Sequence, residues 1–343
     1  MLEGVQGKHL YAFRFSLGGN MTPKRIGWID AAKGIAIIAV VIYHTDIAPA
    51  ILHSLMGSFQ IPLFFFLAGY TFHARPVGET ARRSAPQLLC PWVLLSLYAS
   101  LANNLWEGDG SPLFLGSTVL RALMLNVSYS VTGIPIVGPA WFLLDLFCAR
   151  LMLAFVLARL NHEGRLAINL LVFGILAGIT SIALSIYCPV CLPLNLPAAL
   201  MGFFFMSCGY AAHEGGCLTL EHRTVSVALR FAMALIVWAV CMGVSDMDLG
   251  YGYYRGLALA GPVGSLAAIG AISMFCMYIE REFPKLTRSL ETCGRRSMTV
   301  YCIHSVEIVA PWYVLDSVAT LPFGWVAVVV FRLALDVGLA LAL

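Results

Sequence analysis

Apolar residues fall into long runs that alternate with short polar loops along almost the whole chain. A helix needs about 20 consecutive apolar residues to cross the hydrocarbon core of a bilayer. Runs of this kind recur throughout the sequence after residue 32. We therefore expect ten membrane-spanning helices, at residues 33–52, 55–73, 87–105, 138–158, 166–187, 195–213, 225–244, 256–279, 297–317 and 322–343.

The composition agrees with this pattern. The 343 residues are 60% hydrophobic and 11% charged, and the mean hydropathy is +0.84. Soluble domains average about 25% charged residues. The sequence therefore predicts an all-α, polytopic integral membrane protein with about ten helices in one bundle, and it excludes a soluble or nucleic-acid-binding domain. One further apolar stretch, 112–127, is short and is interrupted by Arg121, so we expect an interfacial or re-entrant piece there.

The first 24 residues differ from the remainder because they are Gly-rich and contain no apolar run. We expect a cytoplasmic, disordered segment at 1–24, followed by a membrane domain at 25–343. Met21 is an alternative start. The first hydrophobic run lacks a small-residue cleavage site, so no signal peptide is expected.

Lys and Arg residues are distributed unevenly between alternate loops, and this bias sets the orientation of membrane helices. If the N-terminus is cytoplasmic, the outer loops receive only Arg121 and Arg255. We therefore expect both termini inside. The cytoplasmic loops then carry Lys8, Arg14, Lys24, Arg25, Arg75, Arg82, Arg83, Arg159, Arg165, Arg223, Arg281, Lys285, Arg288, Arg295 and Arg296.

The first apolar segment carries an unusual set of polar residues. Asp30 and Lys33 are three residues apart and are neighbours on one helix face. Lys33 and His44 are eleven residues apart, which is about 1100° of helical rotation and roughly 16 Å of rise. One face of this helix thus joins a cation at the membrane surface to a titratable base inside the membrane.

The phrase Asp-x-x-Lys-Gly-Ile-Ala at 30–36, followed by His44, resembles the first membrane helix of the acyltransferase 3 family, in particular its fucose 4-O-acetylase-like branch. The basic residue of that family is most often Arg; Lys33 keeps the charge but lacks the planar fork that binds phosphate bidentately. Three later phrases extend the resemblance: Pro-Leu-Phe-Phe-Phe-x-x-Gly-Tyr at 62–70, Trp-Phe-Leu at 141–143 and Ser-Met-x-Val-Tyr-x-x-His at 297–304.

A Phe-rich phrase that ends in Gly-Tyr also recurs at 202–210. This single shared phrase is the only sign of an internal repeat.

Arg82 and Arg83 precede the third segment. An Arg pair in a cytoplasmic loop is explained by topology alone. Such a pair can also bind the phosphates of an acyl donor such as coenzyme A, and we keep this as the second interpretation.

Two later segments place polar residues at membrane depth. Trp141 suits an interfacial aromatic belt, and Asp145 lies about one turn deeper, where a carboxylate usually faces a partner or a cavity. Tyr301, His304 and Glu307 share one helix face. A lone His in a span can be a packing residue, but this set indicates the wall of a polar cavity.

The resemblance implies a bacterial inner-membrane O-acyltransferase that moves acetyl from acetyl-CoA to a hydroxyl of a cell-envelope or exported carbohydrate. It implies that Lys33 and His44 are the essential pair, with Asp30 orienting Lys33. His44 would act as a general base or would hold the acetyl group as an acyl-imidazole. The acyl-donor or cavity candidates are Arg82, Arg83, Trp141, Asp145, Tyr301 and His304.

Two alternatives remain open at this stage: a membrane transporter, whose substrate path would use the same intramembrane polar groups, and a non-catalytic membrane domain with the family's fold. No bound cofactor is expected. No metal is expected either, because Cys188 and Cys191 lack a second pair of ligands nearby. The expected partners are the acyl-CoA donor, the carbohydrate or glycolipid acceptor and the lipid bilayer.

Overall fold

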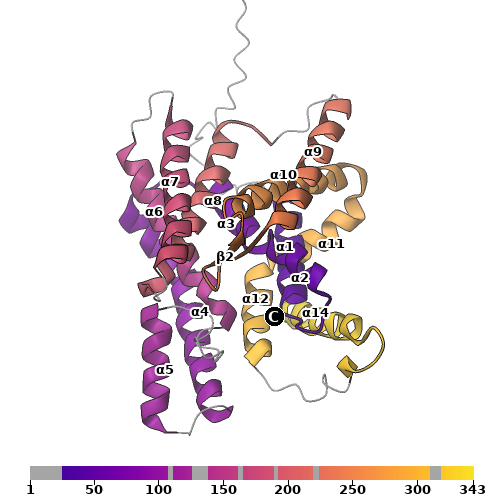
Figure 1. Cartoon of the computed structure of the whole chain (residues 1–343). Coiled ribbons are helices and arrows are strands. Elements are labelled where there is room, and N and C mark those ends of the chain that lie inside the picture. The colour runs from indigo at the N-terminus through magenta and orange to yellow at the C-terminus, as the bar shows by residue number, and fades with distance from the viewer. Residues whose placement is uncertain are drawn as a thin grey trace, which may run out of the picture.

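The computed structural model describes residues 25–106, 111–125, 138–160, 165–188, 192–218, 224–309 and 318–343. The expected disordered segment at 1–24 lies outside this part of the chain. The described residues form an α-helical bundle with one short hairpin (Figure 1). The elements are α1 (Gly27–Tyr43), α2 (Ala50–Gly57), α3 (Gln60–Tyr70), α4 (Val77–Trp106), α5 (Pro112–Leu125), η1 (Gly138–Ala140), α6 (Trp141–Arg159), α7 (Leu166–Tyr187), η2 (Pro193–Asn195), α8 (Leu196–Glu214), α9 (Thr224–Val244), β1 (Ser245–Asp248), β2 (Tyr253–Gly256), α10 (Ala260–Glu282), α11 (Pro284–Arg295), α12 (Ser297–Val309) and α14 (Gly324–Ala342).

The all-α, polytopic fold class is confirmed, although the number of spans differs. Eight helical segments among the described residues are long and apolar enough to cross a membrane. The predicted spans at 138–158, 166–187, 195–213, 225–244 and 322–343 are reproduced within a few residues. The ninth predicted span is only partly present, because α12 is 13 residues long and 310–317 lie outside the described residues.

The first predicted span, 33–52, is wrong at both ends. Helix α1 begins at Gly27 and ends at Tyr43, and α2 begins a new helix after Pro49. Proline disfavours helical backbone at the residue before it, so Pro49 makes a break at this point favourable. His44 therefore caps the C-terminus of α1 and does not lie in the middle of a long helix.

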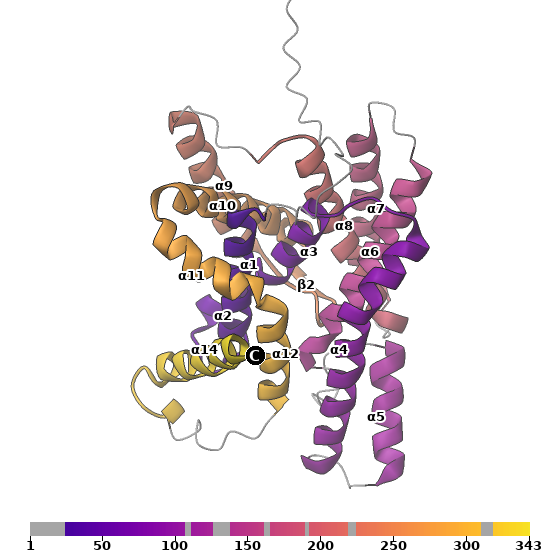
Figure 2. The same cartoon turned by 180° about the vertical axis from the view of Figure 1, so that it is seen from behind.

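Helix α4 begins ten residues earlier than predicted, at Val77. Arg82 and Arg83 accordingly lie within its first turns and not in a loop before it. Beside it, the apolar stretch around Arg121 forms the 14-residue helix α5. Helices α4 and α5 lie side by side and extend away from the rest of the bundle (Figures 1 and 2).

An antiparallel hairpin, which the sequence did not predict, precedes α10. Strand β1 pairs with β2 in a register that sets Ser245 opposite Gly256 and Asp248 opposite Tyr253. Gly252 and Gly256 have φ of 61° and 65°, the left-handed region that glycine adopts without steric cost. The hairpin lies over the C-terminal end of α1.

Two helix crossings depend on glycine. In the first, α11 packs along α1: a Cβ on Gly34 would clash with the Leu290 carbonyl, and a Cβ on Gly294 would clash with the Asp30 carbonyl. Helix α11 lies in a region expected to be only a charged cytoplasmic loop. The glycine of the Lys-Gly phrase thus permits close backbone packing.

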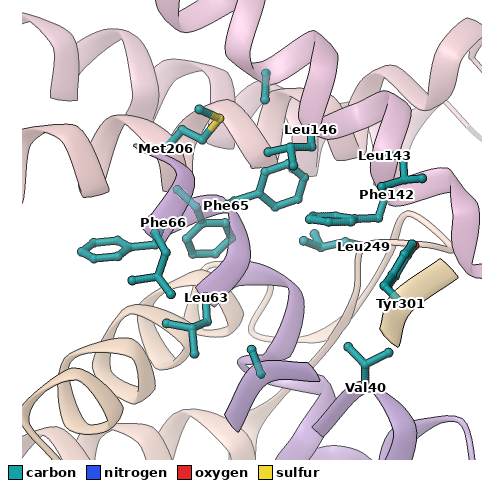
Figure 3. Close-up of a cluster of buried hydrophobic side chains, with 14 of the residues drawn as sticks. Val40, Leu63, Phe65, Phe66, Phe142, Leu143, Leu146, Met206, Leu249 and Tyr301 are labelled. Atoms are coloured by element: carbon teal, nitrogen blue, oxygen red, sulfur yellow. The ribbon is translucent and has the colours of Figure 1, made fainter. Parts of the chain in front are cut away.

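The second crossing joins the two Phe-rich phrases, which lie on α3 and α8. A Cβ on Gly69 would clash with the Met206 carbonyl, and a Cβ on Gly209 would clash with the Phe66 carbonyl. The contact is reciprocal, since each glycine meets the backbone three residues before the other. Around this crossing lie fully buried side chains of α3, α6 and α8 (Figure 3).

Candidate active site

His44 is held at the C-terminal end of α1 with one ring nitrogen already engaged. Its Nδ1 lies 2.9 Å from the Val40 carbonyl oxygen. A carbonyl can only accept, so Nδ1 carries the proton in this contact and Nε2 is left with a lone pair. The Arg332 guanidinium donates to the His44 carbonyl oxygen at 2.6 Å. A cation at this place also complements the negative end of the helix dipole.

His44 lines a cavity of about 180 Å³, which we call the histidine cavity. Its walls come from the end of α1, the start of α3, the start of α6, α12 and the hairpin loop. They combine aromatic rings with hydrogen-bonding groups, the usual make-up of a small-molecule site. The lining residues used below are Tyr43, His44, Gln60, Trp141, Tyr251 and Tyr301.

Trp141 and Tyr301, both cavity candidates from the sequence, therefore lie together on this wall. The Tyr301 hydroxyl donates to the Pro139 carbonyl. Gly250 lies close to the Trp141 indole, so that a Cβ there would press on Nε1.

Tyr43 ties the hairpin to α1 above the cavity. Its hydroxyl donates to Asp248 Oδ2 at 2.5 Å, while Asp248 Oδ1 accepts from the Tyr251 backbone N–H at 3.0 Å. Burial raises the pKa of the Asp248 carboxyl, and these hydrogen bonds oppose the rise. Asp248 was not a candidate from the sequence because it lies in a polar loop.

A buried ionic cluster lies behind His44. The rings of His44 and His304 are 5.4 Å apart between centroids. His304 Nδ1 is 2.9 Å from Asp336 Oδ2 and 3.3 Å from Glu307 Oε2. Arg332 Nε is 3.1 Å from Glu307 Oε1. His304 does not line the histidine cavity.

The ionic cluster is balanced without a proton on His44. Arg332 and a protonated His304 would face the carboxylates of Glu307 and Asp336, two positive groups against two negative ones. A proton on His44 would lie next to the Arg332 guanidinium, which contacts the His44 carbonyl oxygen. The cluster therefore favours a neutral His44 imidazole, the form that a general base needs.

The same cluster brings three kinds of metal ligand together, since ligand atoms of His304, Glu307 and Asp336 lie within 4.8 Å of one another. The Arg332 side chain is in contact with Glu307, and His304 Nδ1 is already bonded to Asp336. A cation beside the guanidinium would be repelled. The ion-paired cluster is therefore a sufficient account of these residues without a metal.

A second cavity, of about 290 Å³, opens at the other end of the bundle; we call it the arginine cavity. Arg75, Arg83 and Arg150 line it, together with Thr71 and Gln87. Three guanidinium groups around one space suit a polyanion such as a phosphate ester. Arg82 is not among its lining residues.

Helices α3 and α6 run from one cavity to the other. Pro62 of α3 lines the histidine cavity, and Thr71, which caps the C-terminus of α3, lines the arginine cavity. On α6, Trp141 lines the histidine cavity and Arg150 the arginine cavity. Nine residues separate each pair, which is about 14 Å along a helix. The two cavities share no lining residue among those described.

Lys33 and Asp30 form the expected ion pair, with Nζ and Oδ1 3.6 Å apart, and Arg25 lies 3.9 Å from the other carboxylate oxygen. The pair lies near the start of α1, the end of the bundle at which Trp28 packs edge-on against Tyr70 of α3. Lys33 lines neither cavity. Its side chain is 31% exposed, so it remains accessible to a ligand.

Asp145 is fully buried between the two cavities and lines neither. Its Oδ2 accepts a hydrogen bond from Asn195 Nδ2 at 3.3 Å. Asn195 has a φ of 48°, which asparagine tolerates better than most residues. A partner from η2 thus satisfies the intramembrane carboxylate, and no pattern along the chain indicates which residue that partner is.

Several residues of the site region were not sequence candidates, among them Gln60, Asp248, Arg332 and Asp336. Arg332 and Asp336 had a usable signal, because two charges four residues apart in an apolar span lie on one helix face and usually face the interior. Gln60 and Asp248 had none.

The fold and site define a polytopic membrane protein with a half-buried histidine in a cavity at one end and a basic cavity at the other. The family model for the acyltransferase domain matches residues 26–341. The chain therefore belongs to the acyltransferase domain family, and it is a membrane acyltransferase that takes an acyl donor and an acceptor. No curated protein and no solved structure matches it. The resemblance found in the sequence is confirmed at the level of the family.

Proposed function

We propose that the protein transfers acetyl from acetyl-CoA to a hydroxyl of a cell-envelope or exported carbohydrate, with His44 as the general base. The observation that carries this proposal is the geometry of His44. Its Nδ1 is bonded to the Val40 carbonyl, and its ring lines a cavity that mixes aromatic and polar groups. A neutral imidazole held in one tautomer is suited to removing a proton from a bound hydroxyl.

The reaction needs one proton transfer in each direction. His44 Nε2 removes the proton of the acceptor hydroxyl, and the oxygen attacks the thioester carbonyl. When the tetrahedral intermediate collapses, the C–S bond breaks and the thiolate leaves with the proton from the imidazolium. The cluster of His304, Glu307, Arg332 and Asp336 lies behind His44 and positions it, because the Arg332 guanidinium of the cluster donates to the His44 carbonyl oxygen.

The arginine cavity is our proposed site for the phosphates of the donor. Its three guanidinium groups supply charge and directional donors. Lys33 adds a fourth cation at the same end of the bundle. If the phosphates bind there, the pantetheine arm must pass alongside α3 over about 14 Å to bring the thioester to His44. We place this end on the cytoplasmic side, where acetyl-CoA is made, in agreement with the Lys and Arg bias.

Acetyl-CoA binding to purified protein tests the donor site. We expect Arg83→Gln and Lys33→Gln to weaken binding roughly 10- to 150-fold, the effect of losing one charge-assisted contact of about 1.5–3 kcal/mol. Lys33→Arg should retain most of the affinity because the charge stays. Arg82→Gln is the matched control, since Arg82 is the sequence neighbour of Arg83 but does not line the cavity.

Equal weakening by Arg82→Gln and Arg83→Gln would show that only the overall surface charge matters. Equal affinity in wild type and Lys33→Gln would remove Lys33 from the donor site. If the wild-type protein binds no acetyl-CoA at all, the acetyl-CoA part of the proposal is wrong, and transport of an acyl or sugar compound becomes the better explanation of the two cavities.

A further inference from the structure

Gln60 is a buried polar residue with an unused hydrogen-bonding atom. It is the first residue of α3, its exposure is 3%, and it lines the histidine cavity. Its Oε1 has no hydrogen-bond partner within the described part of the chain. Leaving a buried acceptor unsatisfied costs about 1–3 kcal/mol, so such an atom calls for a partner that is supplied from elsewhere.

The surroundings restrict what that partner can be. An amide oxygen accepts hydrogen bonds, so the partner must present a donor. The cavity also contains the His44 base, and under the proposed function a hydroxyl must lie against His44 Nε2. A rigid ligand that places one hydroxyl against His44 would bring a second hydroxyl to a different wall of the same cavity. Gln60 belongs to α3 and His44 to α1, so the two contact points lie on different helices.

We propose that Gln60 Oε1 accepts a hydrogen bond from a second hydroxyl of the acceptor, next to the one that is acylated. The site thereby selects ring polyols with neighbouring hydroxyls over simple alcohols. This inference rests on the proposed function, and it assigns the acceptor contact to a residue that no sequence motif indicated.

The shape of the cavity agrees with a small ring. Its volume of about 180 Å³ is below the roughly 300–1,000 Å³ of sites for drug-sized ligands. Trp141 and Tyr251 supply aromatic faces, on which the C–H faces of a sugar ring can pack. A neighbouring cavity of about 270 Å³ shares Tyr43, His53 and Gly57 with it, which leaves room for the remainder of a longer acceptor.

The experiment measures acetyl transfer from radiolabelled acetyl-CoA by full-length protein in detergent micelles. The acceptors are methyl glycosides of common hexoses and 6-deoxyhexoses, and then monodeoxy derivatives of the best of them. The variants are Gln60→Met, which keeps the length of the side chain without its polar atoms, and Gln60→Glu, which keeps an accepting oxygen. Gel filtration and thermal unfolding check that each variant is folded.

We expect the wild type to lose roughly 2- to 13-fold in kcat/KM when the hydroxyl beside the acetylated one is removed, the effect of one neutral hydrogen bond. Gln60→Met should treat the parent and that deoxy acceptor alike, with an unchanged KM for acetyl-CoA. Gln60→Glu should keep the discrimination.

The outcomes separate the two proposals. If no glycoside in the panel accepts acetyl from the wild-type protein, the carbohydrate acceptor is wrong and this inference falls with it. If transfer occurs and folded Gln60→Met discriminates between parent and deoxy acceptors as strongly as wild type does, only the role of Gln60 is wrong, and Oε1 binds water.

Discussion

Two buried helix junctions of this protein are held together by different kinds of interaction. At the crossing of α3 and α8, glycines bring two backbones into contact and apolar side chains fill the remaining space. At the junction of α1, α12 and α14, charged side chains fill it, and the helices are joined through ion pairs and a guanidinium contact to a carbonyl. Both junctions are buried, but only the second borders a cavity that contains His44.

The difference separates a junction that serves the stability of the fold from one that also serves the candidate active site. Lipid tails are as apolar as leucine, so membrane helices associate through close packing and interhelical hydrogen bonds. The glycine crossing holds its two helices together by close packing of the backbones and of apolar side chains. The ionic junction contains buried charges, which are costly to desolvate. Its Glu307 and Asp336 carboxylates can stabilise a proton on His304. We therefore expect substitutions in the first to affect folding alone and substitutions in the second to affect activity as well.

The largest expected effect is that of His44→Ala, which should lower acetyl transfer roughly 100- to 10,000-fold, since a positioned general base contributes that much. The protein should remain folded, because His44 caps a helix whose buried face is unchanged. Steady-state transfer with radiolabelled acetyl-CoA measures the loss, with His213→Ala as a control at a half-exposed site far from the cavity. Near wild-type transfer by His44→Ala would exclude it as the base.

Arg332→Met should have the next largest effect. It leaves Glu307 buried without its cation, which costs about 3–5 kcal/mol in the free energy of unfolding. Combining it with Glu307→Leu should recover much of that loss, because both charges are then gone. Thermal unfolding in detergent measures both variants. Losses that simply add in the double variant would show that the two charges do not interact.

Gly209→Leu tests the apolar junction. The side chain would force α8 away from the Phe66 carbonyl on α3, at a cost of about 1–3 kcal/mol. Gly270→Leu is the matched control, because a Cβ on Gly270 meets no atom within 4 Å. Yield and melting temperature should fall only for Gly209→Leu, and the protein that does fold should keep the donor KM of wild type. Equal destabilisation of both would refute the crossing.

The smallest expected effect is that of Tyr43→Phe, which removes one hydrogen bond to Asp248 and should cost about 0.5–1.5 kcal/mol. The loss should be local to the hairpin. Hydrogen exchange of the 245–256 amides should become faster, while exchange in α3 and α8 stays unchanged. Tyr278→Phe, at a half-exposed site on α10, is the control. Unchanged exchange in the hairpin would show that other contacts hold it to α1.

The parts of the fold that sequence predicted are those that depend on one helix at a time. Runs such as 166–187 are continuous and apolar, so their ends coincide with those of α7. The break after Tyr43 was missed because His44, Thr45 and Asp46 interrupt two apolar runs only briefly, and Pro49 is the one helix-breaking residue between those runs. The hairpin was missed because four-residue strands in a polar loop leave no periodic signal.

Some members of the candidate site were predictable from the sequence, but the contacts between them were not. Tyr301 and His304 were chosen for their shared face on one helix. The contact of His304 with His44 depends on how α12 packs against α1, and that of Arg332 with His44 joins residues 288 positions apart. Contacts of this range are set by the three-dimensional packing of helices, which the pattern along a single chain does not contain.

The apolar side chains that α3 and α6 place between the two cavities bear on the membrane itself. Leu63, Phe65 and Leu67 of α3, with Leu143 of α6, are fully buried and separate one polar space from the other by about 14 Å. A continuous chain of water molecules through this apolar layer would let ions pass and would dissipate the ion gradients that a cell maintains across its membrane. A donor arm that crosses this layer must therefore fill the space that it opens between the side chains. Those side chains must pack together again when the arm leaves. We therefore expect the Phe-rich phrase of α3 to limit the passage of ions as well as to pack the helices.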